Sequence, residues 1–220
     1  MGTSWIIFQQ VLVMFLLAAI GFFAFRIGKI TSEGSKTIGN LLIYVSLPAV
    51  IVKGFLVERT PERIQALLVS MAVCAAVLGL CILIARLIFR TDAIAAFGAS
   101  FSNPGFFGIP LITAVLGDHA VFFVAPYIAF LNLLQWSYGV SLLTGERTGL
   151  KPKYVLTAPF MIATLTGLVL FFFRISLHPI LTKTLELSAG LNTPLSMFAV
   201  GVYLAQCKFG HMLKNKRVYA

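Results

Sequence analysis

The sequence predicts an all-α membrane protein that crosses the bilayer about seven times. Of its 220 residues, 59% are hydrophobic and only 11% are charged, and the mean hydropathy is +0.96. Soluble globular domains of ordinary composition carry about 25% charged residues, so this chain lies outside that class. Several apolar runs also reach the roughly 20 residues that an α-helix needs to span the hydrocarbon core of a bilayer.

Seven apolar runs follow one another along the chain. The first run lacks the pattern of a signal peptide, because no Lys or Arg precedes it while Arg26 and Lys29 follow it. After the seventh run the chain continues as a basic tail. The expected helices span residues 5–25, 38–57, 64–89, 93–116, 120–144, 154–173 and 185–206, and the tail spans 208–220.

The positive charges follow the pattern of membrane topology and not that of a nucleic-acid-binding surface. The formal net charge is +10, and the 17 Lys and Arg residues gather between the apolar runs. Connections after odd-numbered runs carry twelve of them and those after even-numbered runs carry four, with Lys53 inside the second run. Since positively charged loops stay in the cytoplasm, we expect an inner-membrane protein with its N-terminus outside and no nucleic-acid partner.

The fourth apolar run contains two prolines and two glycines where an unbroken helix is not expected. Pro104 and Pro110 each lack an N–H and clash with the preceding turn, while Gly105 and Gly108 add permissive backbone. The residue before a proline, here Asn103, is pushed away from helical geometry. A break at membrane depth is tolerated only where the backbone is buried in protein or lines a cavity. The stretch is therefore predicted to be the centre of a transport site; the simpler alternative is a bend.

A helix that restarts after this break presents backbone N–H groups and a partial positive charge, which favour a bound anion. A carboxylate held there needs no buried lysine. No Asp or Glu lies at mid-membrane depth in the seven runs, so no carboxylate site for a coupling ion is visible. The three His and three Cys residues show no metal-type spacing, and no serine has an adjacent base. We therefore expect no catalytic residue, no metal and no cofactor.

Polar side chains also occur in the middle of the fifth run. Asn132 and Gln135 are three residues apart and so share one face of a helix, with Ser137 close by. One interpretation is a polar pocket that hydrogen-bonds a small solute. The other is that these amides join neighbouring helices, as Asn and Gln often do in membranes.

The second and seventh runs carry a faint repeat. Pro48 in the second run is followed by Gly54, and Pro194 in the seventh run is followed by Gly201. Both prolines are expected to disturb their helices. The two runs are five helices apart, so a repeated unit of five helices would be inverted in the membrane. Inverted repeats with broken helices are typical of secondary transporters.

Residues of the fourth and fifth runs resemble the auxin efflux carrier family. The resemblance is carried by the stretch 102–111, which reads Ser-Asn-Pro-Gly-Phe-Phe-Gly-Ile-Pro-Leu, by Gly117 and Asp118 after it, and by Asn132 and Trp136. It runs along essentially the whole chain. The family includes plant auxin carriers and bacterial carriers of malonate and related acids.

The resemblance implies a ten-helix fold of two inverted five-helix repeats, similar to that of bile-acid and sodium–proton carriers. Helices one, two, six and seven would form a scaffold, and helices three to five and eight to ten a moving transport domain, with helices four and nine broken and crossing near the midplane. Residues 1–144 would be the first repeat, and 145–220 the start of the second with the basic tail. Because helices eight to ten are not present, we expect a truncated product or a fragment.

The same resemblance implies that Asn103 contacts the substrate carboxylate and that Asn132 faces the substrate. Ser137 stands where the plant carriers have a tyrosine. The predicted function is a secondary transporter of small organic anions such as malonate, working by alternating access, with the bilayer and a second copy bound through the scaffold helices as partners. The expected substrate-binding residues are Asn103, Gly105, Asn132, Gln135 and Ser137, and the expected helix-breaking residues are Pro48, Pro104, Gly108, Pro110 and Pro194.

Two other classes of function are compatible with seven apolar helices. The first is a seven-helix receptor or photoreceptor, although residues 185–206 contain no lysine that could hold retinal. The second is a membrane-embedded enzyme, which the sequence does not favour because it has no cluster of nucleophile, base or metal ligands.

Overall fold

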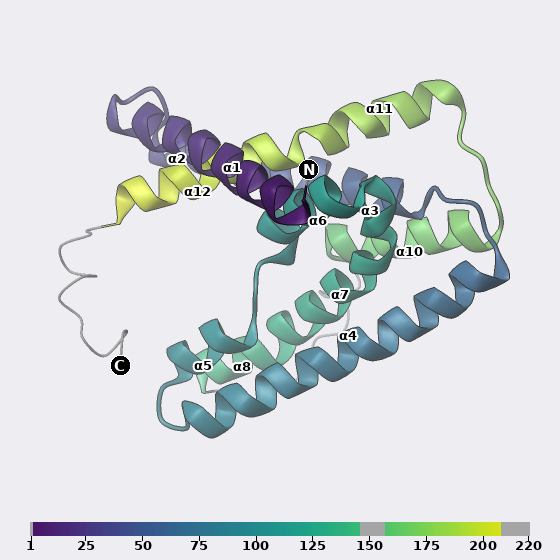
Figure 1. Cartoon of the computed structure of the whole chain (residues 1–220). Helices are drawn as coiled ribbons and strands as arrows, with labels where there is room; N and C mark the ends of the chain where they lie inside the picture. The colour runs from purple at the N-terminus through teal and green to yellow at the C-terminus, as the bar shows by residue number, and fades with distance from the viewer. Residues whose placement is uncertain (1, 146–156, 208–220) are drawn as a thin grey trace.

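The computed structural model describes residues 2–145 and 157–207, and helices dominate this part of the chain (Figure 1). Six helical spans are long and apolar enough to cross a membrane, and a shorter apolar helix adds a seventh. No strand occurs among these described residues. The predicted class, an all-α polytopic membrane protein, is thus confirmed. In chain order the spans are Thr3–Arg26, Ser32–Phe55, Pro61–Ile88, Ala93–Leu116, Asp118–Thr144, the shorter Pro159–Phe172, and Pro179–Gln206.

The first two spans differ in regularity: the first is one helix and the second has three segments. Helix α1 covers Thr3–Arg26, close to its predicted range. The second span consists of α2 (Ser32–Leu41), the π-turn η1 (Leu42–Ser46) and α3 (Leu47–Phe55). It begins earlier than predicted because Thr31 caps it, its hydroxyl accepting a hydrogen bond of 3.1 Å from a backbone N–H in the first turn.

The second span continues past Pro48 without a break. Its backbone stays helical at Leu47, with φ −63° and ψ −45°. Pro48 lies in the first turn of α3, directly after the π-turn η1. A π-turn widens the helix by one residue, which accommodates a proline ring that would otherwise clash with the preceding turn. The sequence predicts that Pro48 disturbs this helix, and the structure shows a π-turn next to it in place of a break.

The third span is the single helix α4 (Pro61–Ile88), whereas the fourth is interrupted. The fourth span consists of α5 (Ala93–Ser100), the π-turn η2 (Pro104–Gly108) and α6 (Ile109–Leu116). Residues 101–103 between its two halves are not helical. The predicted broken fourth helix is thus present.

The fifth span starts with the short turn η3 (Asp118–Ala120) and continues through α7 (Val121–Leu134), the π-turn η4 (Gln135–Gly139) and α8 (Val140–Thr144). Pro126 lies inside α7. The proline removes one backbone donor from the helix. In the turn before it, the carbonyl of Phe123 accepts a hydrogen bond of 2.8 Å from the hydroxyl of Ser70 in α4. This bond joins the third and fifth spans.

The last two described spans are α10 (Pro159–Phe172) and the pair of helices α11 (Pro179–Gly190) and α12 (Asn192–Gln206). The seventh span starts earlier than the predicted residue 185, because Pro179 occupies its first turn behind the capping residue His178. The first residues of α11 include Thr182, Lys183 and Thr184, so an apolar run does not extend back to the true start of the helix. The span is interrupted at Leu191, shortly before Pro194. The predicted start of the sixth helix at residue 154, the loop charges at 147–153 and the basic tail lie outside the described residues.

A cluster of buried apolar side chains lies between α3, α7 and α10. Phe55, Phe122 and Phe171 are almost completely buried there. The Phe122 ring lies 5.5 Å from the Phe55 ring and 5.0 Å from the Phe171 ring, between centroids. Gly167 of α10 provides the room, since a Cβ at this position would collide with the Phe55 ring. By contrast, many large apolar side chains of α1 and α4 are exposed, as expected of surfaces that face lipid.

Helices α1 and α12 lie against each other although they are far apart in sequence (Figure 1). Two glycines allow this close approach. A Cβ on Gly21 would collide with the backbone of Phe198, and a Cβ on Gly201 would collide with the carbonyl of Ala18 and lie 2.7 Å from the backbone nitrogen of Phe22. Small residues at such crossings are how membrane helices maximise backbone contact.

Candidate functional site

The interruption of the fourth span is built by its sequence. Phe101 is extended, with φ −117° and ψ 105°, and Asn103 has φ −113° and ψ 75°. Asn103 precedes a proline, and the ring of Pro104 disfavours the helical region for the residue before it. The helix restarts at Pro104 itself, where a missing N–H costs nothing because the first turn has no intrahelical acceptor for it. Pro110 likewise lies in the first turn of α6.

Asn103 caps the second half of the interrupted span. Its Oδ1 accepts a hydrogen bond of 3.3 Å from the backbone N–H of Phe106. The Oδ1 is thereby committed to the helix, so the side-chain Nδ2 is the group that remains to donate a hydrogen bond outward. Asn103 is exposed. The arrangement therefore presents an amide donor beside a helix N-terminus, which is suited to an oxyanion.

The seventh span holds the interruption in place. Asn192, which is 2% exposed, donates from Nδ2 to the carbonyl of Gly105 at 3.1 Å. Ser196 donates to the carbonyl of Phe106, also at 3.1 Å. Both spans are irregular where they meet. The fourth span is interrupted at 101–103, and the seventh is interrupted at Leu191, directly before α12 begins at Asn192. Among the described residues, the Oδ1 of Asn192 is buried and has no hydrogen-bond partner.

Gly105 occupies the contact between the interruption and the second span. It is buried, and a Cβ at this position would lie 3.3 Å from a methyl group of Leu47. A larger side chain would push α3 away from the π-turn η2. Gly108 is less confined, because its nearest neighbour would be the side chain of Pro104 at 3.5 Å.

The polar residues of the fifth span bond mainly within their own helix. Asn132 donates from Nδ2 to the carbonyl of Ile128 at 2.8 Å. Ser137 is buried, and its hydroxyl donates to the carbonyl of Leu133 at 2.6 Å. Gln135 is half-buried and makes no side-chain hydrogen bond within the described part of the chain. None of the three therefore joins two helices through a hydrogen bond among the described residues, which does not favour the interpretation as interhelical contacts.

The fifth span reaches the interruption through other residues than those predicted. The hydroxyl groups of Ser102 and Tyr127 lie 3.1 Å apart. Gly139 packs on the fourth span, since a Cβ there would lie 3.0 Å from the ring of Phe101. No hydrogen bond among the described residues joins Asn103 to the polar residues of the fifth span. Sequence reasoning placed these elements together but missed Ser102–Tyr127, because a lone Ser or Tyr in an apolar run carries no distinguishing signal.

Asn192 and Ser196 are the other contacts that the sequence did not assign to the site. Asn192 lies two residues before Pro194, one of the two prolines of the repeat. A polar residue within an apolar run is the signal that could have identified it. Its partner could not be deduced, because the partner is a backbone carbonyl 87 residues away.

An ion pair joins the end of α3 to the residue that follows the end of α6. Lys53 Nζ lies 2.6 Å from Asp118 Oδ2. Gly117, in the left-handed region at φ 84°, ends α6 and places Asp118 at the start of the fifth span. Lys53, which the sequence places inside the second apolar run, thus has a carboxylate partner at the end of its helix. The described residues hold no group of three His, Cys, Asp or Glu side chains that could bind a metal.

Comparison with known proteins gives a family and two relatives. The model of a family described as membrane transport protein matches residues 6–155. A candidate malonate transporter of Rhizobium meliloti (strain 1021) is 26% identical over 213 residues, which cover 89% of this chain and 66% of that protein. An uncharacterized transporter of Methanocaldococcus jannaschii is 24% identical over 217 residues, which cover 91% of this chain and 70% of that protein. The chain therefore spans about two thirds of the length of these relatives.

Proposed function

Since the chain belongs to the membrane transport protein family, we propose that it carries small organic anions such as malonate across the membrane. Membership in this family makes it a multi-pass membrane transporter and not an enzyme. The same membership sets the receptor hypothesis aside. The malonate in the name of one relative, which is 26% identical, supports a small dicarboxylate as substrate.

The observation that carries the proposal is the interruption at 101–103 with Asn103 at the start of the second half-helix. The outward Nδ2 of Asn103 and the helix N-terminus would bind one carboxylate without a buried lysine. Backbone irregularity at membrane depth is retained in proteins where it lines a substrate pathway. Gln135, whose amide makes no hydrogen bond among the described residues, is a candidate on the fifth span for a second polar contact.

The proposed mechanism is alternating access around this interruption. Helices three to five, residues 61–144, would move as a unit against a scaffold made of the first two and last two described spans. The contacts of Asn192 with Gly105 and of Ser196 with Phe106 would lie at the boundary of the two parts. The division into an inverted pair of units, residues 1–144 and 145–220, belongs to the same proposal, as do an inner-membrane location with the N-terminus outside and a homodimer through the scaffold.

Transport of radiolabelled malonate into proteoliposomes tests the substrate and the site together. Asn103→Ala removes the amide donor and the cap, and Gly105→Leu forces a side chain against Leu47. We expect each variant to reduce the rate at least tenfold. The matched controls are Asn40→Ala, an exposed amide of α2, and Gly79→Leu, a position in α4 where a Cβ meets nothing within 4 Å. The site assignment is wrong if Asn103→Ala and Gly105→Leu transport malonate at the wild-type rate.

Binding of malonate to the purified chain, measured by calorimetry, separates the substrate from the mechanism. Binding that is lost in Asn103→Ala, without any transport by the wild type, would support the anion site and contradict transport by this chain alone. Transport without a preference for malonate over monocarboxylates would contradict the dicarboxylate substrate.

A further inference from the structure

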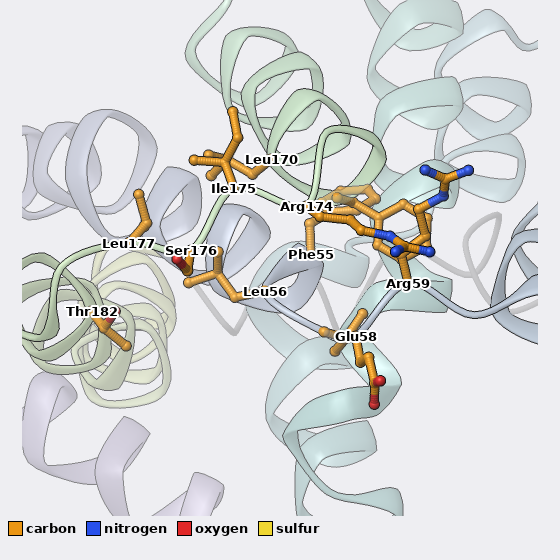
Figure 2. A pocket seen from close by; sticks show the side chains of 12 residues that line it. Phe55, Leu56, Glu58, Arg59, Leu170, Arg174, Ile175, Ser176, Leu177 and Thr182 are labelled. Carbon is orange, nitrogen blue, oxygen red and sulfur yellow. The ribbon is translucent and has the colours of Figure 1, made fainter.

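A cavity of about 520 Å³ lies where the ends of three spans meet (Figure 2). Its volume falls within the range of roughly 300–1,000 Å³ that is usual for small-molecule sites. None of the residues that line it belongs to the interrupted fourth span. The walls are the segment 55–59 at the end of α3, the segment 170–177 that ends α10 and leads toward α11, and Thr182 of α11.

Arg59 supplies an unsatisfied donor to this cavity. Its Nη1 donates to the carbonyl of Phe172 at 3.0 Å, which is one of the carbonyls left open at the end of α10. Its Nε is buried and has no hydrogen-bond partner among the described residues. Because Nη1 is engaged and Nε is buried, Nη2 is the group of this guanidinium that remains to donate to a ligand in the cavity. A hydrogen bond from this charged group to a carboxylate or phosphate oxygen is stronger than one between neutral groups.

Arg174 lines the same cavity in a strained backbone conformation. Its φ is 55°, and it is the only non-glycine residue with a positive φ among the described residues. It ends α10 in a Schellman arrangement, in which its own N–H bonds the carbonyl of Phe171 and the N–H of Ile175 bonds the carbonyl of Leu170. Glycine is the residue that this position favours, because a Cβ is disfavoured in the left-handed region. An arginine at this position is strained, and strained backbone of this kind occurs most often at functional sites.

The two arginines bring positive charge to one side of the cavity. Figure 2 shows both guanidinium groups on the same side, while the carboxylate of Glu58 points in another direction. Neither arginine belongs to an ion pair within the described ranges, where the pairs are Lys53–Asp118 and Lys183–Glu186. Two cations without an ion-pair partner on one side of a cavity favour an anionic ligand.

We infer that this cavity binds an oxyanion, a carboxylate or a phosphate, between Arg59 and Arg174. The site is separate from the interruption of the fourth span and does not depend on the proposed substrate. It lies at the same end of the second span as Lys53, beyond the end of α3. Its ligand is either a soluble anion such as malonate or phosphate, or the phosphate of a lipid headgroup, since all present the same oxygens to a guanidinium group.

Calorimetry on the full chain in phosphatidylcholine nanodiscs tests the soluble ligands, with malonate and inorganic phosphate as probes. Arg59→Gln removes the first charge and its Nη2 donor, and Arg174→Gly removes the second charge while it relieves the left-handed backbone. We expect each to weaken binding at least tenfold, and Arg174→Gly to unfold at a temperature no lower than the wild type. Lys183→Gln is the control, since it removes one charge from α11 at a residue that does not line the cavity.

A second set of nanodiscs containing phosphatidylglycerol tests the lipid source, with native mass spectrometry as the measure of retained lipid. Retention by the wild type that is lost in Arg59→Gln and Arg174→Gly supports the site and assigns it to a headgroup. Loss of malonate or phosphate binding in the same variants supports it and assigns it to a soluble anion. The inference is overturned if both variants bind every probe like the wild type, or if Lys183→Gln weakens binding as much. Binding that is lost in Asn103→Ala alone would also overturn it.

Discussion

At the scale of the residue, Asn192 determines the position of the interrupted helix. Its amide is almost fully buried and donates a hydrogen bond to the backbone carbonyl of Gly105. Its own Oδ1 has no partner among the described residues. Burying the Oδ1 of this amide without a hydrogen-bond partner costs free energy. The hydrogen bond from its Nδ2 to the Gly105 carbonyl, which positions the interrupted span, is the gain that explains such a residue here.

Asn192→Ala is expected to destabilise the protein by about 1–3 kcal/mol, because it leaves the Gly105 carbonyl buried without a donor. Transport should fall further than stability alone explains, since the start of the second half-helix would shift. Thermal unfolding in detergent and malonate uptake measure the two effects. Thr184→Ala, an exposed residue of α11 whose hydroxyl bonds within its own helix, is the control. An unchanged unfolding temperature in Asn192→Ala would contradict this role.

The residues of the site were predictable to different degrees. Asn103 could be identified because two prolines and two glycines surround it, and these residue types act on their own backbone. The orientation of its amide could not, since Oδ1 and Nδ2 are assigned by a neighbouring N–H that exists only once the helix has restarted. Asn132 and Gln135 were correctly placed in the middle of the fifth span, but their roles in binding remain predictions. Ser137 turns its hydroxyl back to its own helix.

At the scale of the element, the crossing of α1 and α12 depends on two glycines. The backbone of each helix occupies the space in which the other would need a Cβ. Such a contact gains van der Waals energy along the whole crossing. It also leaves no tolerance for growth, because the obstructing atoms are backbone and cannot rotate away.

Gly201→Ala is therefore expected to cost about 1–3 kcal/mol, the usual range for overpacking a tight contact. Gly79→Ala in the middle of α4 should have the opposite sign, because its Cβ meets nothing within 4 Å and alanine favours helices by about 0.5–1 kcal/mol. Thermal unfolding of the two variants side by side decides between them. Equal midpoints would show that α1 and α12 adjust to each other more freely than the structure indicates.

The elements themselves were predictable where hydropathy marks them and less so elsewhere. The positions of the seven spans followed from apolar runs, with the ends shifted by caps such as Thr31 and His178 that a window average does not detect. Pro48 and Pro104 illustrate a finer limit. Pro48 follows the π-turn η1 and Pro104 begins the π-turn η2, yet one span continues and the other breaks. Leu47 before Pro48 stays helical, whereas Phe101 and Asn103 before Pro104 do not, so a proline alone does not predict which of the two outcomes occurs.

At the scale of the whole molecule, the proposed orientation predicts which ends of the helices face outward. The ion pair Lys53–Asp118 ties the end of the second span to the start of the fifth. The opposite end of the fifth span packs on α5, because Gly139 of η4 touches Phe97. The connection before α5 should then face the cytoplasm and the residues around Asp118 the outside.

Cysteine accessibility in intact cells measures this orientation. In a background without Cys74, Cys81 and Cys207, His119→Cys should react with a membrane-impermeant thiol reagent and Thr91→Cys should not until the cells are opened. Both positions are exposed residues outside the helix interiors, so burial does not explain a difference. The reverse pattern of labelling would invert the molecule in the membrane.

The α1–α12 crossing has a consequence for how the protein is made. Gly21 and Gly201 are 180 residues apart in the sequence, so the first span enters the membrane long before its partner exists. At translation speeds of about 5–20 residues per second, the gap is roughly 9–36 s. During this time the glycine face of α1 is open to lipid and to any other small-residue helix nearby. Assembly of the molecule thus depends on α1 remaining available to α12 until that helix has been made.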